Sequence, residues 1–173
     1  MKRTVCVIIL LALLLCSCGR SSDAVDFYYL RTCNHQDDYH AYFSEGAIIA
    51  EERDVSGHRN DLNYLLTMYL RGPMDPQLKS PFPAGCSLID VYMEGRELTV
   101  YLSSGASLLD DLDLNIACAC LAKTCMQIAG TDTVHIQSRS TGNLILFSTT
   151  ITSDDLLLEV TLPPETVPAE EIQ

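Results

Sequence analysis

The sequence predicts one small α+β domain in the order β-(β)-α-β-β-α-β-β, with two helices packed on one face of a mostly antiparallel sheet. Two segments carry apolar residues at helical spacing, and the segments around them are rich in aromatic and β-branched residues. The chain has 173 residues, of which 47% are hydrophobic and 20% are charged. This length allows a single domain, and this composition excludes a fully disordered chain.

The first half of the predicted domain holds two strands and one helix. An aromatic, β-branched run predicts a strand at 24–30, and an apolar triplet predicts a second strand within 41–55. A helix is predicted over 56–71, with Ser56 or Asn60 as its N-cap. Its apolar residues recur at the spacing of one helix face, namely Leu62, Leu65, Leu66, Tyr69 and Leu70.

The clearest strand signal is a hairpin formed by 87–93 and 97–102, with a turn at 94–96. Apolar residues alternate along both strands, so each strand has one apolar face. On the first strand this face comprises Ile89, Val91 and Met93, and on the second Leu98, Val100 and Leu102.

A second helix is predicted over 110–129, with acidic residues near its positive N-terminal end and Gly130 as its C-terminal stop. A last hairpin is expected from 133–138 and 143–150. The helix has a single predicted apolar stripe, made of Leu114, Ala117, Cys118, Leu121, Cys125 and Ile128.

The N-terminus has the pattern of a lipoprotein signal peptide at 1–17. A short basic segment precedes an unbroken apolar run at 5–15, which is too short to span a bilayer. Ser17 then precedes Cys18, as in a bacterial lipobox, so cleavage between them and diacylglyceryl modification of Cys18 are expected. Several acyl chains would hold the protein on the extracytoplasmic face of the membrane. The alternatives are an uncleaved anchor and a secreted protein cut elsewhere.

Three further parts follow the signal peptide: a lipid-anchored tether at 18–24, a domain at 25–152 and an acidic, proline-containing tail at 153–173. The chain has 11 basic and 23 acidic residues, a formal net charge of −12. It has no run of five basic residues, so binding to nucleic acid is not expected.

A proline-rich loop after the first helix carries the most specific pattern. The helix stop Gly72-Pro73 and the loop that follows resemble the GerMN domain, the sporulation and spore-germination domain of Gram-positive bacterial lipoproteins. The resemblance extends over roughly 25–151 and implies export, lipidation and a protein-interaction role, with a fold similar to ring-building modules of sporulation membrane complexes. It transfers no catalytic residues. The matching positions are Gly72, Pro73, Leu78, Ser80, Pro81, Pro83 and Gly85.

Other clusters give little evidence of chemistry. The loop at 33–40 (CNHQDDYH) holds residue types that bind zinc, but its spacing matches no closed structural site. Cys118 and Cys120 would point about 200° apart on a helix, and Cys118 and Cys125 fall on the apolar stripe. We therefore predict no catalytic, cofactor-binding or metal-binding residues.

These patterns favour a non-catalytic, lipid-anchored module of the cell envelope. The resemblance to the GerMN domain suggests a sporulation or spore-germination assembly as its setting. It would bind a protein partner, or a second copy of itself, through its sheet or a helix face. One alternative is a small-ligand-binding lipoprotein associated with a transporter or receptor, and another is an enzyme such as a cell-wall hydrolase.

Overall fold

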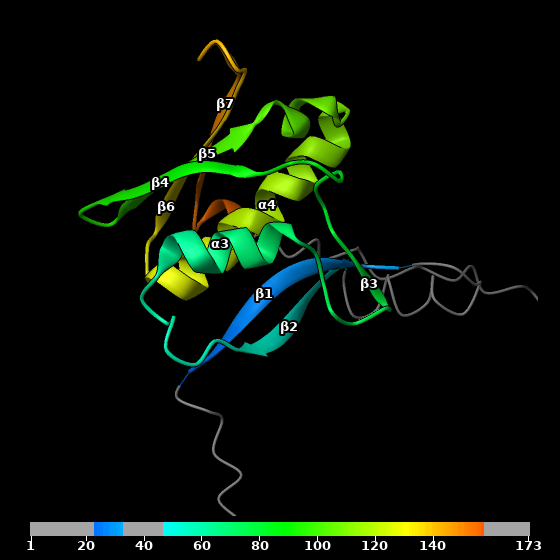
Figure 1. The fold of residues 1–173 in the computed structure, drawn as a ribbon, viewed down its shortest axis with the longest axis vertical. Helices are drawn as coiled ribbons and strands as arrows, with labels where there is room; N and C mark the ends of the chain where they lie inside the picture. The colour runs from blue at the N-terminus through cyan, green and yellow to red at the C-terminus, as the bar shows by residue number, and fades with distance from the viewer. Residues whose placement is uncertain (1–22, 33–46, 158–173) are drawn as a thin grey trace, which may run out of the picture.

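The computed structural model describes residues 23–32 and 47–157, and it confirms a single α+β domain (Figure 1). The described part contains two α-helices, two short 3₁₀ helices and seven strands. In chain order these are β1 (Ala24–Arg31), β2 (Ile48–Asp54), α3 (Leu62–Leu70), β3 (Leu78–Lys79), β4 (Leu88–Glu94), β5 (Glu97–Ser103), η1 (Ser104–Leu108), α4 (Asp111–Ala129), β6 (Thr133–Arg139), β7 (Ile145–Thr152) and η2 (Asp155–Leu157).

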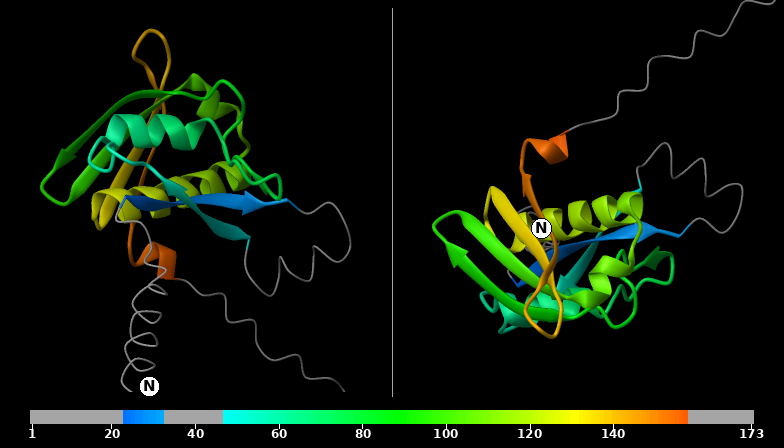
Figure 2. Two further views of the ribbon diagram at one scale, coloured as in Figure 1. Left: turned by 60° about the horizontal axis from the view of Figure 1, so that its bottom comes forward. Right: turned by 90° about the horizontal axis from the view of Figure 1, so that it is seen from above.

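The strands form two sheets, whereas the sequence predicted one. The first sheet has the order β2-β1-β3, and both of its strand pairs are antiparallel. The second has the order β4-β5-β6-β7 and is antiparallel except for the parallel pair β5–β6. Helix α4 is the crossover between these two parallel strands, and it lies between the sheets (Figure 2).

The position of α4 explains why the strands divide. On one side α4 contacts β1, and on the other it contacts β6 and β7. The buried hydroxyl of Thr124 accepts a hydrogen bond of 2.9 Å from the Tyr28 backbone N–H, so the helix covers the edge of β1 where β3 does not reach.

Because it is covered on two sides, α4 is buried over more than the predicted stripe. Cys118, Leu121 and Cys125 are buried as expected, but Cys120 and Thr124 are fully buried as well. Small side chains at these positions let α4 approach both sheets closely. By length and composition α4 is the one helix of the described part that could cross a membrane, yet here it is the central helix of the core.

Helix α3 begins later than predicted. Asp61 is its N-cap, and the Asp61 side chain accepts a hydrogen bond from the Tyr64 backbone N–H. Ser56 and Asn60 therefore do not cap it. The intervening residues form turns instead, in which the N–H of His58 donates to the carbonyl of Val55.

The β4–β5 hairpin forms as predicted, but only part of the predicted apolar face of β4 is buried. Leu98, Val100 and Leu102 of β5 are fully buried. On β4 only Val91 is buried, while Ile89 and Met93 are exposed. A register shift between Leu88 and Asp90 interrupts the alternation at Ile89, and a cleft lies beside Met93.

Both ends of the chain extend beyond the residues that the structure describes. At the C-terminal end of the described residues, Asp155–Leu157 forms a 3₁₀ helix. The rest of the tail, from 158, lies outside the described residues, as do the signal peptide, Ser17 and Cys18.

Candidate functional site

The loop that resembles the GerMN motif connects α3 to β4 along one edge of the first sheet. Gly72 has φ +95°, a conformation that favours glycine, and it ends the first helix as predicted. Leu78 belongs to the two-residue strand β3, which pairs with the end of β1. The sequence predicted only a loop here, because the pairing partner lies far away in the chain.

The second part of this loop is anchored by its own side chains and backbone. The Ser80 hydroxyl accepts a hydrogen bond from the Phe82 N–H, and Pro81 and Phe82 are buried. The Pro83 carbonyl accepts from the Cys86 N–H, and Gly85 has φ +92°. The motif residues therefore shape the connection into β4.

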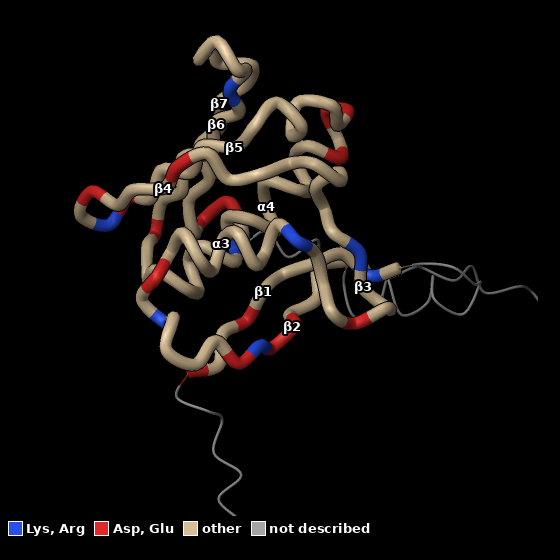
Figure 3. The backbone as a smooth tube through the Cα atoms, in the orientation of Figure 1, with Lys and Arg blue, Asp and Glu red and all other residues tan. Residues whose placement is uncertain are grey.

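A buried ion pair from β2 fixes the start of the same loop. Glu51 and Arg53 lie on the same side of β2, whose charged residues follow one another in Figure 3. The Glu51 Oε2 and Arg53 Nη2 atoms are 2.5 Å apart, with side chains only 11% and 7% exposed. Arg53 Nη2 also donates to the Gly72 carbonyl at 2.7 Å. The other oxygen of Glu51 accepts from the backbone N–H groups of Met74 and Asp75.

Arg53 is also held by two aromatic rings of β1. Its guanidinium carbon is 5.4 Å from the ring centre of Phe27 and 5.5 Å from that of Tyr29, as in cation–π contacts. Burial raises the pKa of Tyr29, whose hydroxyl donates to the Tyr69 carbonyl, so Tyr29 stays neutral. We name Glu51 and Arg53, together with the backbone of 72–75, the loop clamp. Its hydrogen bonds to the backbone of Gly72, Met74 and Asp75 hold the start of the loop against β2.

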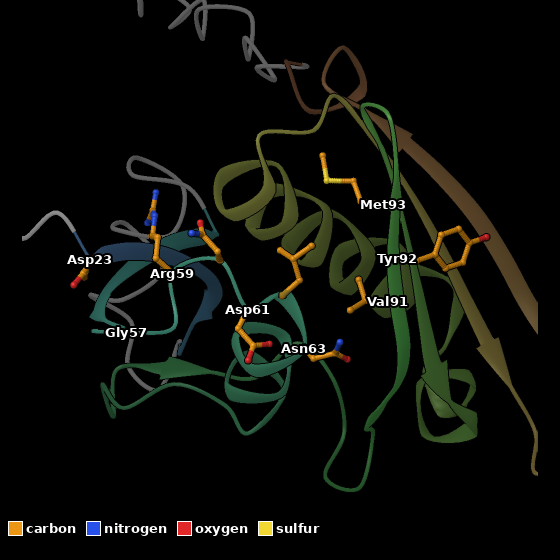
Figure 4. Close-up of a pocket in the computed structure, with 10 residues that line it drawn as sticks. Asp23, Gly57, Arg59, Asp61, Asn63, Val91, Tyr92 and Met93 are labelled. Carbon is orange, nitrogen blue, oxygen red and sulfur yellow. The ribbon is translucent and has the colours of Figure 1, made fainter.

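A cleft of about 760 Å³ lies on a different part of the surface, between the N-terminal end of α3 and strand β4 (Figure 4). Val91 and Met93 point toward it, whereas Tyr92 points away to the other face of the sheet (Figure 4). The remaining wall comes from Asp23, the β2–α3 turn and the first turn of α3.

Two polar side chains in the wall of this cleft make hydrogen bonds within the protein. Arg59 Nη1 donates to the Ala24 carbonyl at 2.6 Å, which ties the β2–α3 turn to the start of β1. The Asp61 carboxylate caps α3. The cleft therefore combines an apolar strand with amide, carboxylate and guanidinium groups, a lining of the kind that binds a ligand or peptide.

The described cysteines are structural. Cys86, Cys118, Cys120 and Cys125 are all unpaired and buried. Burial raises the pKa of Cys86 to about 11 and those of Cys118 and Cys120 to about 12. Each thiol is therefore protonated at neutral pH and unreactive as a nucleophile.

The zinc-like loop at 33–40 and the lipidation site Cys18 lie outside the described residues. Within the described ranges, no group of three or more His, Cys, Asp or Glu side chains is arranged to hold a metal ion. Comparison with protein-family models, curated proteins and solved structures gives no match. The resemblance to the GerMN domain therefore stays a prediction.

Sequence reasoning missed both the loop clamp and the cleft. The clamp had one available signal, the Glu-x-Arg spacing that places Glu51 and Arg53 on the same side of a strand. The cleft had none, because its walls come from segments that are about 30 residues apart in the chain, 57–63 and 91–93.

Proposed function

We propose that this protein is a non-catalytic, lipid-anchored module of the cell envelope that binds a protein partner through the cleft beside β4. The observation that carries the proposal is an edge strand beside a sizeable cleft, with the exposed side chain of Met93 facing that cleft. Met93 is 43% exposed, and Ile89, on the same strand but outside the cleft, is 52% exposed.

Strand β4 supports this role by its place in the sheet. It pairs with β5 on one side, and in the described part of the chain no strand pairs with its other edge. The Val91 N–H is bonded to the neighbouring Asp90 carboxylate at 2.9 Å, a bond that a partner backbone could replace. An extended segment of a partner would add to this edge, with its apolar side chains against Val91 and Met93.

Membrane attachment is the second part of the proposal. The lipobox cysteine, Cys18, precedes Asp23 by five residues, and Asp23 lines the cleft. If Cys18 carries acyl chains, the cleft opens close to the membrane surface, where it would meet membrane proteins. The GerMN-like motif loop favours an assembly of sporulation or spore germination.

Photocrosslinking in cells tests the proposal. A photoreactive amino acid replaces Met93 in one strain and the exposed Asp154 in a control strain. We expect a discrete protein adduct from position 93 in the membrane fraction and none from position 154. Loss of this adduct in a Cys18→Ser variant would tie binding to the anchor, and identical adducts at both positions would refute the proposed site.

A small-ligand-binding lipoprotein is the second candidate, and the volume of the cleft favours it. Ligand pockets commonly enclose roughly 300–1,000 Å³. A thermal shift with an amino acid or a sugar that is lost in a Met93→Asp variant would support this candidate. If no compound in such a screen changes the melting temperature, the ligand-binding candidate is excluded and protein binding remains as the proposed function.

A further inference from the structure

A second, smaller hollow of about 180 Å³ lies where the loop after α3 meets the start of α4. One wall comes from the end of β3 and the loop that follows it, at 79–83. The other wall comes from Leu109 and Asp113 at the start of α4, and Leu30 of β1 completes the lining. We name this site the motif-loop hollow. It shares no lining residue with the cleft beside β4.

The loop side of this hollow is already ordered by contacts within the protein. Lys79 pairs with Leu30 across the two strands, so their side chains stand on the same face of the sheet. The ring of Pro81 fixes its own φ, and Pro81 and Phe82 are buried. The Phe82 N–H donates to the Ser80 hydroxyl at 3.3 Å. A ligand would therefore lose little affinity to the ordering of this wall.

Two opposite charges belong to the lining of the motif-loop hollow. Lys79 and Asp113 are its only charged residues, and both side chains are exposed. They form no ion pair with each other or with another residue of the described part. The backbone N–H of Asp113 is bonded to the Asp110 carboxylate, but the carboxylate of Asp113 itself is not engaged in this bond. The hollow thus offers one cationic and one anionic group to a ligand.

The charges next to the hollow favour a ligand that carries both signs. Asp111 adjoins Asp113 in the first turn of α4, and Asp110 is the N-cap of that helix, so negative charge accumulates on this side. Arg31 follows Leu30 in β1, and the alternation of a strand places its side chain on the opposite face of the sheet. A ligand with a carboxylate alone would be attracted by Lys79 and repelled from the start of α4.

The size and the apolar lining of the hollow narrow the class of ligand further. Pockets for drug-sized ligands commonly enclose roughly 300–1,000 Å³, which is more than this hollow offers. A water molecule takes about 30 Å³ of the liquid, so the hollow corresponds to about six such volumes. Leu30, Phe82 and Leu109 supply apolar surface. An α-amino acid with a short aliphatic side chain combines an ammonium group, a carboxylate and an apolar group at this size.

We infer that the motif-loop hollow binds a free amino acid with a short aliphatic side chain. The carboxylate of the ligand pairs with Nζ of Lys79, and its ammonium group pairs with the carboxylate of Asp113. The aliphatic side chain of the ligand packs against Leu30 and Phe82. Binding at this site requires neither the lipid anchor nor the cleft beside β4, so its test is independent of the proposed function.

Ligand-observed saturation-transfer NMR on the full chain in detergent tests this site with L-valine. Isovalerate and isobutylamine are the matched probes, because they are valine without its amino group and valine without its carboxylate. We expect saturable binding of L-valine and at least tenfold weaker binding of either probe. Lys79→Gln and Asp113→Asn should each weaken the binding of L-valine at least tenfold. Both side chains are exposed, so circular dichroism should show an unchanged fold.

Matched variants separate this hollow from other charged or apolar surfaces. Asp111→Asn removes a neighbouring carboxylate outside the lining, and Met93→Asp alters the cleft, so both should bind L-valine as the unmodified chain does. Lys79→Glu leaves two carboxylates in the lining and should prefer isobutylamine to L-valine.

Several results would overturn this assignment. They are no saturable binding of L-valine, equal binding of isovalerate, and a loss in Asp111→Asn or Met93→Asp as large as that in Asp113→Asn. Tighter binding of phosphoethanolamine than of L-valine, with the same dependence on Lys79 and Asp113, would also overturn it, because the ligand would then be a lipid headgroup.

Discussion

Removal of Glu51 from the loop clamp should destabilise the protein strongly. The Glu51→Ala change leaves the guanidinium of Arg53, with a side chain that is 7% exposed, without its carboxylate. Breaking a buried ion pair by removing one partner typically costs about 3–5 kcal/mol. Arg53 keeps the Gly72 carbonyl and its two aromatic neighbours, so we expect about 3 kcal/mol, the low end of that range.

The assay is urea unfolding of the 173-residue chain in detergent, followed by tyrosine fluorescence or circular dichroism. The matched control is Arg96→Ala, which breaks the ion pair with Asp132, two exposed side chains. A surface pair contributes at most about 1 kcal/mol. The double variant Glu51→Leu/Arg53→Met should be more stable than Glu51→Ala alone, because no buried charge remains unpaired.

Two results would refute this reasoning. One is a Glu51→Ala loss no larger than that of Arg96→Ala, which would mean that water reaches Arg53 and solvates it. The other is a double variant less stable than Glu51→Ala, which would mean that Arg53 contributes mainly through its contacts with Phe27 and Tyr29. The first outcome would mean that the loop clamp does not stabilise the fold.

Three further predictions concern the core and the pH response. Thr124→Val removes the hydroxyl that accepts a hydrogen bond from the Tyr28 N–H at the β1 edge. It should lower the free energy of unfolding, measured by urea denaturation, by about 1–3 kcal/mol. Thr124→Ser keeps a hydroxyl and should retain most of this free energy. Iodoacetamide at pH 8 should leave the peptide containing Cys118 and Cys120 unmodified until urea unfolds the chain, as read by mass spectrometry; rapid labelling of the folded protein would contradict the burial of these thiols. Hydrogen bonds from Ser56 lower the pKa of Asp54 below its ordinary 3.8. The stability that Asp54 contributes is therefore present above that value and lost as the pH falls through the lower folded-state pKa, so Asp54→Asn should flatten the decline in stability below pH 4.

The elements that the sequence predicted well are those with strong local signals. The β4–β5 hairpin has regular alternation and Gly95 with φ +63° in its turn, and α4 has an acidic N-cap at Asp110 and a left-handed Gly130 at its end. These features depend on neighbours within a few residues, so a pattern in the chain is sufficient to locate them.

The features that the sequence did not predict depend on contacts between distant segments. Cys120 and Thr124 look like the polar side of an amphipathic helix until β1 is placed against them. Arg53 looks solvent-exposed until the Gly72 carbonyl and two aromatic rings enclose it. The division into two sheets follows from the same cause, since a helix covered on both sides separates the strands.

The central claim, that β4 binds a protein partner, is tested most directly by amide hydrogen exchange over residues 89–94. The rates are compared between the chain in native membranes and the purified chain in detergent, with the turn at 74–77 as an internal reference. The account predicts exchange at least tenfold slower over 89–94 in native membranes, because a partner segment pairs with this edge. Equal rates in the two preparations, with an unchanged reference turn, would contradict it.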